Sequence, residues 1–149
     1  MGICVFVTVE GEDEPVLEQR TDGKPLADVV AGWIWFPEVV RLLGLSPSAI
    51  QSLQLVDQSE YGDDSGDAPA DVWQDPLRLR DALDELRSVF QRVRANPAVI
   101  DEIDRASRGN ASGYFDFERF DAYEMDVEDA CAVCDWAAAH GKRVALVAS

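Results

Sequence analysis

The segment from Asp75 to Val93 constrains the fold of this chain more than any other. Asp75 is a favourable N-cap and Pro76 a favourable first helical residue. Large apolar residues then recur at spacings of 4, 3, 4 and 3, at Leu79, Leu83, Leu86, Phe90 and Val93. This periodicity predicts an amphipathic helix that ends near Asn96-Pro97. It is too short for a coiled coil, so we expect the helix to pack on a sheet.

Apolar, β-branched segments lie near both ends of the chain. Ile3–Val9 ("ICVFVTV") and residues 143–148 ("RVALVA") are apolar on both faces, which is typical of buried strands, and we expect the first to be central in its sheet. "YFDFERF", residues 114–120, predicts another strand. Residues 46–57 ("SPSAIQSLQLVD") contain two competing signals: Ser46-Pro47 resembles a helix start, whereas Leu53 and Leu55 alternate as in a short strand. We expect a helical turn followed by a strand.

Further helices are expected before and after the central one. Residues 26–34 have helical spacing up to Pro37, and a short turn then ends at Gly44. A helix follows Pro97. The last helix is predicted to begin at Asp126, with Asp129 completing a variant capping box, and to stop at Gly141.

This order of elements predicts an α/β or α+β fold, with a three- or four-stranded sheet and about four to five helices packed on it. The length of 149 residues fits a single domain, residues 1–149. A hydrophobic content of 47% gives such a domain enough core material and argues against disorder.

The charge of the chain is strongly negative and unevenly distributed. The net charge is −16, and residues 1–75 alone carry fifteen acids against three bases. Residues 76–108 are nearly balanced, with six acids and seven bases. Such a field repels nucleic acid and anionic membranes and attracts basic proteins. We therefore expect a basic protein partner, and neither nucleic acid nor a membrane.

The acidic stretch from Asp57 to Asp75 contains seven carboxylates and no Lys, Arg or His. It fits no EF-hand register, because Ala68 stands where either the last Glu or the central Gly is required. Its Gly, Pro and Ser residues are typical of a solvated loop. Aromatic residues near both ends also suit a surface for a basic partner. The candidate partner-binding residues are Asp57, Glu60, Tyr61, Asp63, Asp64, Asp67, Asp71 and Trp73. The acids from Asp116 to Asp135 are additional candidates for the same partner.

No residue pattern indicates a catalytic, metal or cofactor site. His140 is the only histidine, and it precedes a helix stop, where a cation interacts favourably with the helix dipole. Cys131 and Cys134 fall on the apolar stripe of the last predicted helix, so we expect them to be buried and free of metal. A zinc site that also used Cys4 would lack a second close pair of ligands.

Two classes of function are consistent with these features. The first is an acidic binding protein of the bacterial cytoplasm, in its most concrete form an immunity-type inhibitor that occludes a basic toxin or nuclease. The second is an enzyme that uses carboxylates for acid–base or metal chemistry, or an accessory subunit of a bacterial complex. Its candidates are Asp116, Glu118, Asp121 and Glu124. An odd number of cysteines and an N-terminus without a basic region favour the cytoplasm. Trp33 and Trp35 suit either the core or an interface.

Overall fold

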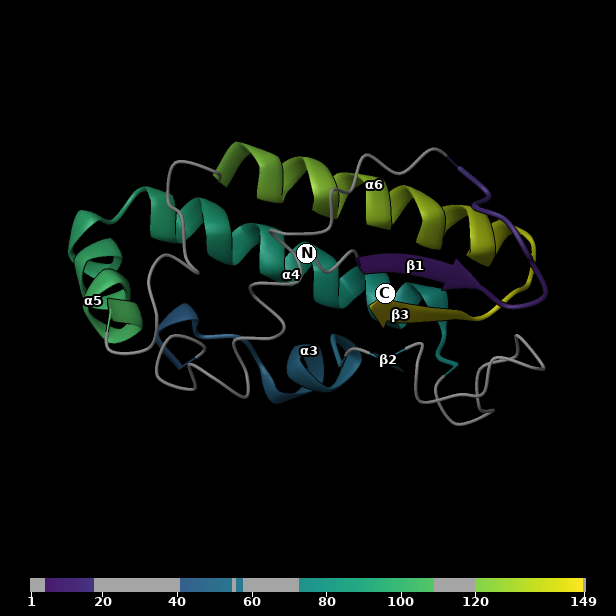
Figure 1. Ribbon diagram of the computed structural model, residues 1–149, viewed down its shortest axis with the longest axis horizontal. Coiled ribbons are helices and arrows are strands. Elements are labelled where there is room, and N and C mark those ends of the chain that lie inside the picture. Colours follow the sequence, from purple (N-terminus) through teal and green to yellow (C-terminus); the bar gives the residue numbers. More distant parts are fainter. Residues whose placement is uncertain (1–4, 18–40, 55, 58–72, 109–119, 149) are drawn as a thin grey trace.

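The computed structural model describes residues 5–17, 41–54, 56–57, 73–108 and 120–148 (Figure 1). Helices and strands are mixed in this part of the chain, which confirms the α+β class. The elements, in chain order, are β1 (Val5–Val9), α3 (Pro47–Ser52), β2 (Val56–Asp57), α4 (Pro76–Arg94), α5 (Pro97–Arg108), α6 (Phe120–Ala139) and β3 (Val144–Ala148).

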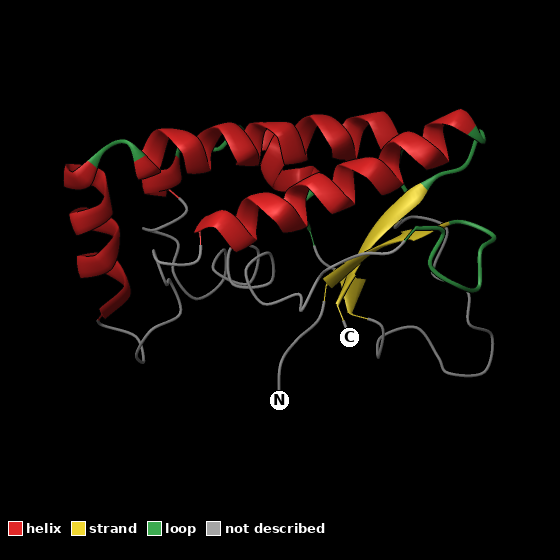
Figure 2. Cartoon of the chain, turned by 90° about the horizontal axis from the view of Figure 1, so that it is seen from above, coloured by secondary structure: helices red, strands yellow, loops and turns green. Residues whose placement is uncertain are grey.

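The two long helices, α4 and α6, lie side by side along the molecule (Figures 1 and 2). The expected apolar stripe of α4 is confirmed, because Leu79, Leu83 and Leu86 are 0% exposed. The expected start is confirmed too: the Asp75 carboxylate accepts a hydrogen bond from the backbone N–H of Leu77 at 2.8 Å. The helix thus begins where the sequence predicts, but its main packing partners are α6 and α3 and not the sheet.

The strands form a small mixed sheet in the order β1-β3-β2. β1 and β3 pair antiparallel over five residues, from Val5↔Ala148 to Val9↔Val144. β2 pairs parallel with β3 over only two residues. The extended part of the sheet is therefore one antiparallel pair, smaller than the three or four strands expected. β3 lies between the others, so the prediction that the first strand is central is wrong.

One face of the sheet packs on α4 and α6. Val7 and Val9 of β1, with Val144 and Leu146 of β3, belong to the same buried cluster as the apolar residues of both helices. The residues from Val144 to Val147 are all buried, so β3 is covered on both faces. This confirms the last strand as a buried strand.

Helix α6 begins at Phe120, six residues before the expected start. Asp126 is not an N-cap: it lies inside the helix and is only 4% exposed. A strand was predicted for residues 114–120, and this prediction is wrong at Phe120, which is helical. Residues 114–119 lie outside the described residues. The end of the helix agrees with expectation, because Gly141 has a φ of +66°, in the left-handed region that glycine accepts without strain.

The shorter helical predictions are confirmed where the structure describes them. Residues 41–43 are helical and the chain turns at Gly44, which has a φ of +73°. Ser46 caps α3, its hydroxyl accepting the Ala49 N–H at 3.2 Å. Residues 26–34 and both Trp33 and Trp35 lie outside the described residues. Among the helices that are described, none is long and apolar enough to cross a membrane.

Candidate partner-binding site

Three arginines on one side of α4 each form an ion pair with a carboxylate on α6. They are spaced seven residues apart, so they share one helix face. Because the partners run in the opposite order along α6, the two helices are antiparallel. The pairs of this arginine–carboxylate row are Arg80–Asp135 (2.6 Å), Arg87–Glu128 (2.6 Å) and Arg94–Glu124 (3.4 Å).

The arginine–carboxylate row changes the interpretation of the acids between Asp116 and Asp135. Glu124, Glu128 and Asp135 were expected to be available to a partner or, for Glu124, to catalysis, but each faces an arginine of its own chain. Asp135 and then Asp84 also raise the pKa of Arg80. These carboxylates therefore pair with arginines between α4 and α6. Asp116 and Glu118 lie outside the described residues.

We expect the Arg87–Glu128 pair to contribute only modestly to stability, because both side chains are more than one-third exposed. A double-mutant cycle with Arg87→Gln and Glu128→Gln should give a coupling energy of about 0.2–1 kcal/mol that falls with added salt. Urea denaturation of the four proteins measures it. Zero coupling at low salt would show that the row does not stabilise the helix pair.

Two further bases are bound at the end of the sheet where β1 ends and β3 begins. The Lys142 ammonium lies 2.6 Å from Glu12, and the Arg143 guanidinium pairs with Glu10. The backbone N–H of Glu10 also donates to the Arg143 carbonyl at 2.9 Å. These contacts fix the turn that follows β1 against the start of β3.

The predicted acidic stretch is attached to β3 at both of its ends. Asp57 forms the end of β2 and pairs with Ala148. Gln74 forms a bridge to Val144, with N–H···O distances of 2.8 and 2.9 Å. These attachment points are four residues apart on β3, or roughly 13 Å at the rise of a strand. The stretch therefore leaves and rejoins the same edge of the sheet.

Most of the predicted partner-binding residues lie between those ends and outside the described part of the chain. This applies to Glu60, Tyr61, Asp63, Asp64, Asp67 and Asp71. Trp73 is described and half-buried, directly before Gln74. The structure thus brings the two ends of the stretch to one edge of the sheet, and the role of the residues between them stays a prediction.

A groove of about 260 Å³ lies between β1 and the segment that returns along it. We call it the β1 groove. It is lined by residues 6–9 of β1, residues 12–16 of the returning segment, and Val147 of β3. Three consecutive acids, Glu12, Asp13 and Glu14, belong to its wall. These three acids were not predicted as candidate site residues, although the run "EGEDE" beside an apolar strand was the available signal.

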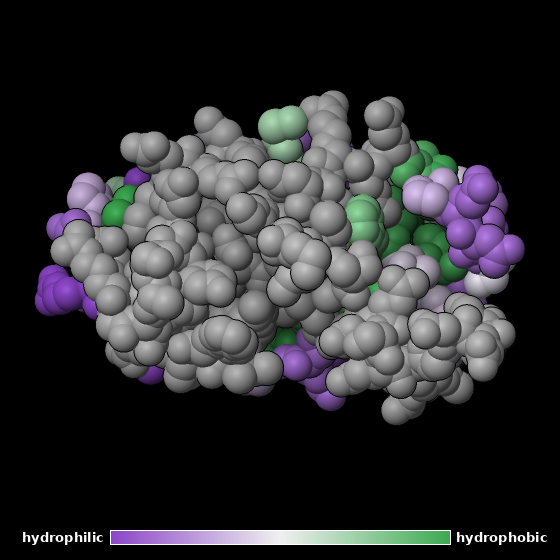
Figure 3. Space-filling view, in the orientation of Figure 1, coloured by the Kyte–Doolittle hydropathy of each residue, from purple (hydrophilic) through white to green (hydrophobic). Residues whose placement is uncertain are grey.

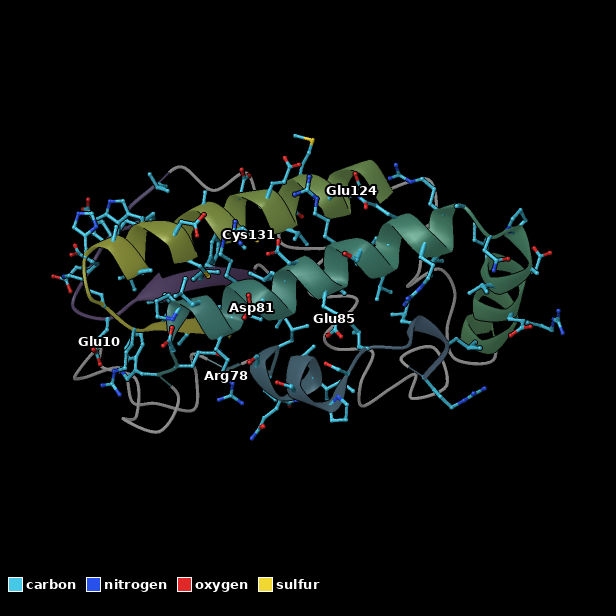
Figure 4. All side chains as sticks on the ribbon, turned by 180° about the vertical axis from the view of Figure 1, so that it is seen from behind. Glu10, Arg78, Asp81, Glu85, Glu124 and Cys131 are labelled. Atoms are coloured by element: carbon cyan, nitrogen blue, oxygen red, sulfur yellow. The ribbon has the colours of Figure 1, made fainter. Side chains whose placement is uncertain are left out.

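A second hollow, of about 270 Å³, lies between α3 and α4. Arg78 and Glu85 extend from α4 toward α3 in this region (Figure 4). Glu85 accepts hydrogen bonds from Ser46, at 3.3 Å from its backbone N–H and 2.9 Å from its hydroxyl. Arg78 donates to Gln51 at 3.1 Å. These hydrogen bonds attach α3 to α4. These polar side chains of the hollow therefore have a structural role.

The two cysteines of α6 are buried, as expected. Cys131 lies on the side of α6 that faces α4 (Figure 4), with its sulfur 3.9 Å from a carboxylate oxygen of Asp84. Burial, and then the charge of Asp84, raise the pKa of Cys131 to about 11. Burial, and then Cys131, raise the pKa of Cys134 to about 12. Both thiols are therefore protonated and poor nucleophiles near neutral pH.

The contacts of His140 are with the last turn of α6. Its ring stacks on Trp136, with centroids 3.9 Å apart, and its Nδ1 lies 2.7 Å from the Trp136 carbonyl oxygen in the last turn of α6. Within the described ranges, no group of three or more His, Cys, Asp or Glu side chains could hold a metal ion.

No known protein family, curated protein or solved structure matches this chain.

Proposed function

We propose that the protein is an acidic cytoplasmic binding protein that occludes a basic protein partner, most concretely as an immunity-type inhibitor of a basic toxin or nuclease. The supporting observation is the distribution of paired and unpaired charge. Arginines at 80, 87, 94 and 143, together with Lys142, face carboxylates of the same chain. Each of these pairs uses one base and one acid, so the excess of acids that gives the net charge of −16 remains.

Several surface carboxylates in the described segments have no basic partner there. These exposed residues are Asp13, Glu14, Asp81, Asp101 and Glu102. A sequence with a net charge of −16 adds further acids between Asp57 and Asp75. Folding the chain around its own arginines therefore leaves a field that is negative toward the solvent.

Such a field favours association with a positively charged surface. Long-range attraction raises the rate of encounter, while carboxylates that become buried against Arg or Lys slow dissociation. On a nuclease, the carboxylates would occupy the positions where substrate phosphates bind, so binding would block the substrate. This is the chemistry expected of an inhibitor that works by occlusion.

The test uses a basic protein that co-purifies with the chain from its native host. Replacing Asp63, Asp64 and Asp67 by Asn removes three charges and preserves size. Association should slow several-fold, and its dependence on salt should flatten, because attraction is screened over roughly 8 Å at physiological ionic strength. Stopped-flow or surface-plasmon measurements at several salt concentrations give both quantities.

The matched control removes the same charge elsewhere, with Asp81→Asn, Asp101→Asn and Glu102→Gln on α4 and α5. We expect a smaller change in the association rate, because these residues are not part of the acidic stretch. An acidic partner would contradict the proposal. If the two triple variants slow association equally, residues 57–75 act only through the net charge of the protein and not as a specific binding surface.

A further inference from the structure

The walls of the β1 groove are held in place by backbone and ion-pair contacts. The Glu12 N–H donates to the Val9 carbonyl at 3.1 Å, and Gly11 permits this turn with a φ of +83°. The Glu12 carboxylate is bound by Lys142 at 2.6 Å. Val16 packs against the buried core. The groove is therefore a formed feature of the fold, closed on one side by the strand and on the other by an anchored segment.

The groove combines an apolar lining with unpaired negative charge. Its apolar part comes from Phe6, Val7, Val9, Val16 and Val147. Asp13 and Glu14 are exposed on its wall, and neither has a basic partner among the described residues. Lys142, which contacts the adjacent residue Glu12, is paired with that carboxylate. The negative charge of Asp13 and Glu14 is thus available to a ligand.

The size of the groove decides between two kinds of ligand. Pockets for small molecules usually have volumes of about 300–1,000 Å³, and this groove has about 260 Å³. It suits a single long side chain better than a metabolite. Lys and Arg bury an apolar stem while keeping the charged head near water or a carboxylate. A guanidinium or ammonium is also attracted to the face of an aromatic ring such as that of Phe6.

The groove lies at the same end of the sheet as one attachment point of the acidic stretch. Val144 of β3 pairs with Val9 on one side and with Gln74 on the other. Two strand spacings, roughly 10 Å, therefore separate the end of β1 from Gln74. Hydrophilic residues gather beside hydrophobic surface at this end of the molecule (Figure 3). A single partner surface can reach both regions.

We infer that the β1 groove binds a cationic side chain, Arg or Lys, of the basic partner, with the stem against the apolar lining and the head between Asp13 and Glu14. This inference rests on the proposed function. It gives that function an anchoring contact: one side chain is held in a formed groove, and the acidic stretch meets the surrounding basic surface.

The probe is a single residue with one positive charge. A multiply charged peptide would bind anywhere on the acidic surface and would not test the groove. N-acetyl-arginine methylamide and N-acetyl-lysine methylamide are titrated into ¹⁵N-labelled full-length protein. N-acetyl-citrulline methylamide, which has nearly the shape of the arginine probe and no charge, is the reference. We expect the charged probes to shift the amide signals of residues 6–9 and 12–16, with affinities in the millimolar range (about −4 kcal/mol). The stronger of the two identifies the preferred cation.

Two variants of equal charge test the position of the site. Asp13→Asn with Glu14→Gln should weaken binding of the arginine probe at least about fivefold, since both carboxylates that face the charged head lose their charge. Asp101→Asn with Glu102→Gln changes another exposed Asp-Glu pair, on α5, and should leave the affinity almost unchanged. Circular dichroism checks that both variants are folded.

The inference is overturned if the citrulline probe binds as well as the arginine probe, if the shifts are spread over the whole acidic surface, or if the α5 variant weakens binding equally. Its failure is distinguishable from failure of the proposed function. If the groove binds no cation but the partner still associates more slowly after the triple Asn change, only the inference about the groove is contradicted. If the groove binds the probe but the partner is acidic, only the proposed function is contradicted.

Discussion

Replacing Leu83 by Ala is expected to lower the free energy of unfolding by about 2–5 kcal/mol. Leu83 lies in the middle of α4, is 0% exposed and belongs to the cluster that joins α4, α6 and the sheet. Removal of its side chain leaves a cavity inside this cluster, whose surroundings cannot fully collapse. Urea denaturation, followed by circular dichroism, measures the loss.

The same helix supplies a matched control. Leu77 is in the first turn of α4 and is 53% exposed. Leu77→Ala makes the identical chemical change where little burial is lost, so it should alter stability by no more than roughly 0.5 kcal/mol. Similar losses at the two positions would contradict the packing of α4 described above, because they would place Leu83 at the surface or Leu77 in the core.

Helix α4 was predictable from sequence because several independent local signals coincide in it. Asp75 and Pro76 mark its start, the apolar spacing marks its buried face, and Asn96-Pro97 marks its end. Each signal depends only on neighbours within the helix. Gly44 and Gly141 were predictable for the same reason, since a left-handed turn is a local requirement.

Helix α6 and strand β1 show where local signals fail. Asp126 and Asp129 resemble a capping box, but Asp126 is inside the helix and buried. A pair of acids three residues apart occurs within helices as well as at their starts, so only the surrounding structure decides. Likewise, the apolar pattern of β1 predicts a buried strand but does not contain the order of strands in the sheet.

The arginine–carboxylate row could have been found from the sequence. Arg80, Arg87 and Arg94 are separated by seven residues, and so are Glu128 and Asp135. Matching intervals of opposite charge on two predicted helices indicate that the helices pair, but not in which direction. The β1 groove could not have been found from the sequence. Its lining combines β1, the returning segment and Val147, and these come together only because β1 pairs with β3.

The thiols of Cys131 and Cys134 are expected to react far more slowly in the native protein than in the unfolded chain. A pKa raised from 9.0 to about 11 lowers the thiolate fraction at pH 8 by roughly 100-fold, and one raised to about 12 lowers it by roughly 1,000-fold. Iodoacetamide labelling, followed by mass spectrometry of the α6 peptide, compares native protein with protein in concentrated urea. Labelling of native protein at the unfolded rate would show that these thiols are not buried.

The same shifts predict how stability depends on pH. Because the protonated thiol is the neutral form and the native state raises its pKa, the native state holds protons that the unfolded chain releases above pH 9. The stabilisation from these two groups is complete below about pH 9 and is lost as the pH rises through 11 to 12. Other groups titrate in that range, so the comparison is with Cys131→Ala/Cys134→Ala. Its stability should decline less steeply over the same interval.

Burial also predicts the route by which the native thiols are labelled. If reagent reaches them only when the fold opens, the labelling rate follows the population of open molecules. Leu83→Ala, which is expected to remove at least about 2 kcal/mol, should then raise the rate about 30-fold or more when the opening is global, since 1.36 kcal/mol is a factor of ten. Leu77→Ala should leave it nearly unchanged. A labelling rate that is unchanged by Leu83→Ala would mean that the reagent reaches the thiols through a local opening that leaves the packing around Leu83 intact.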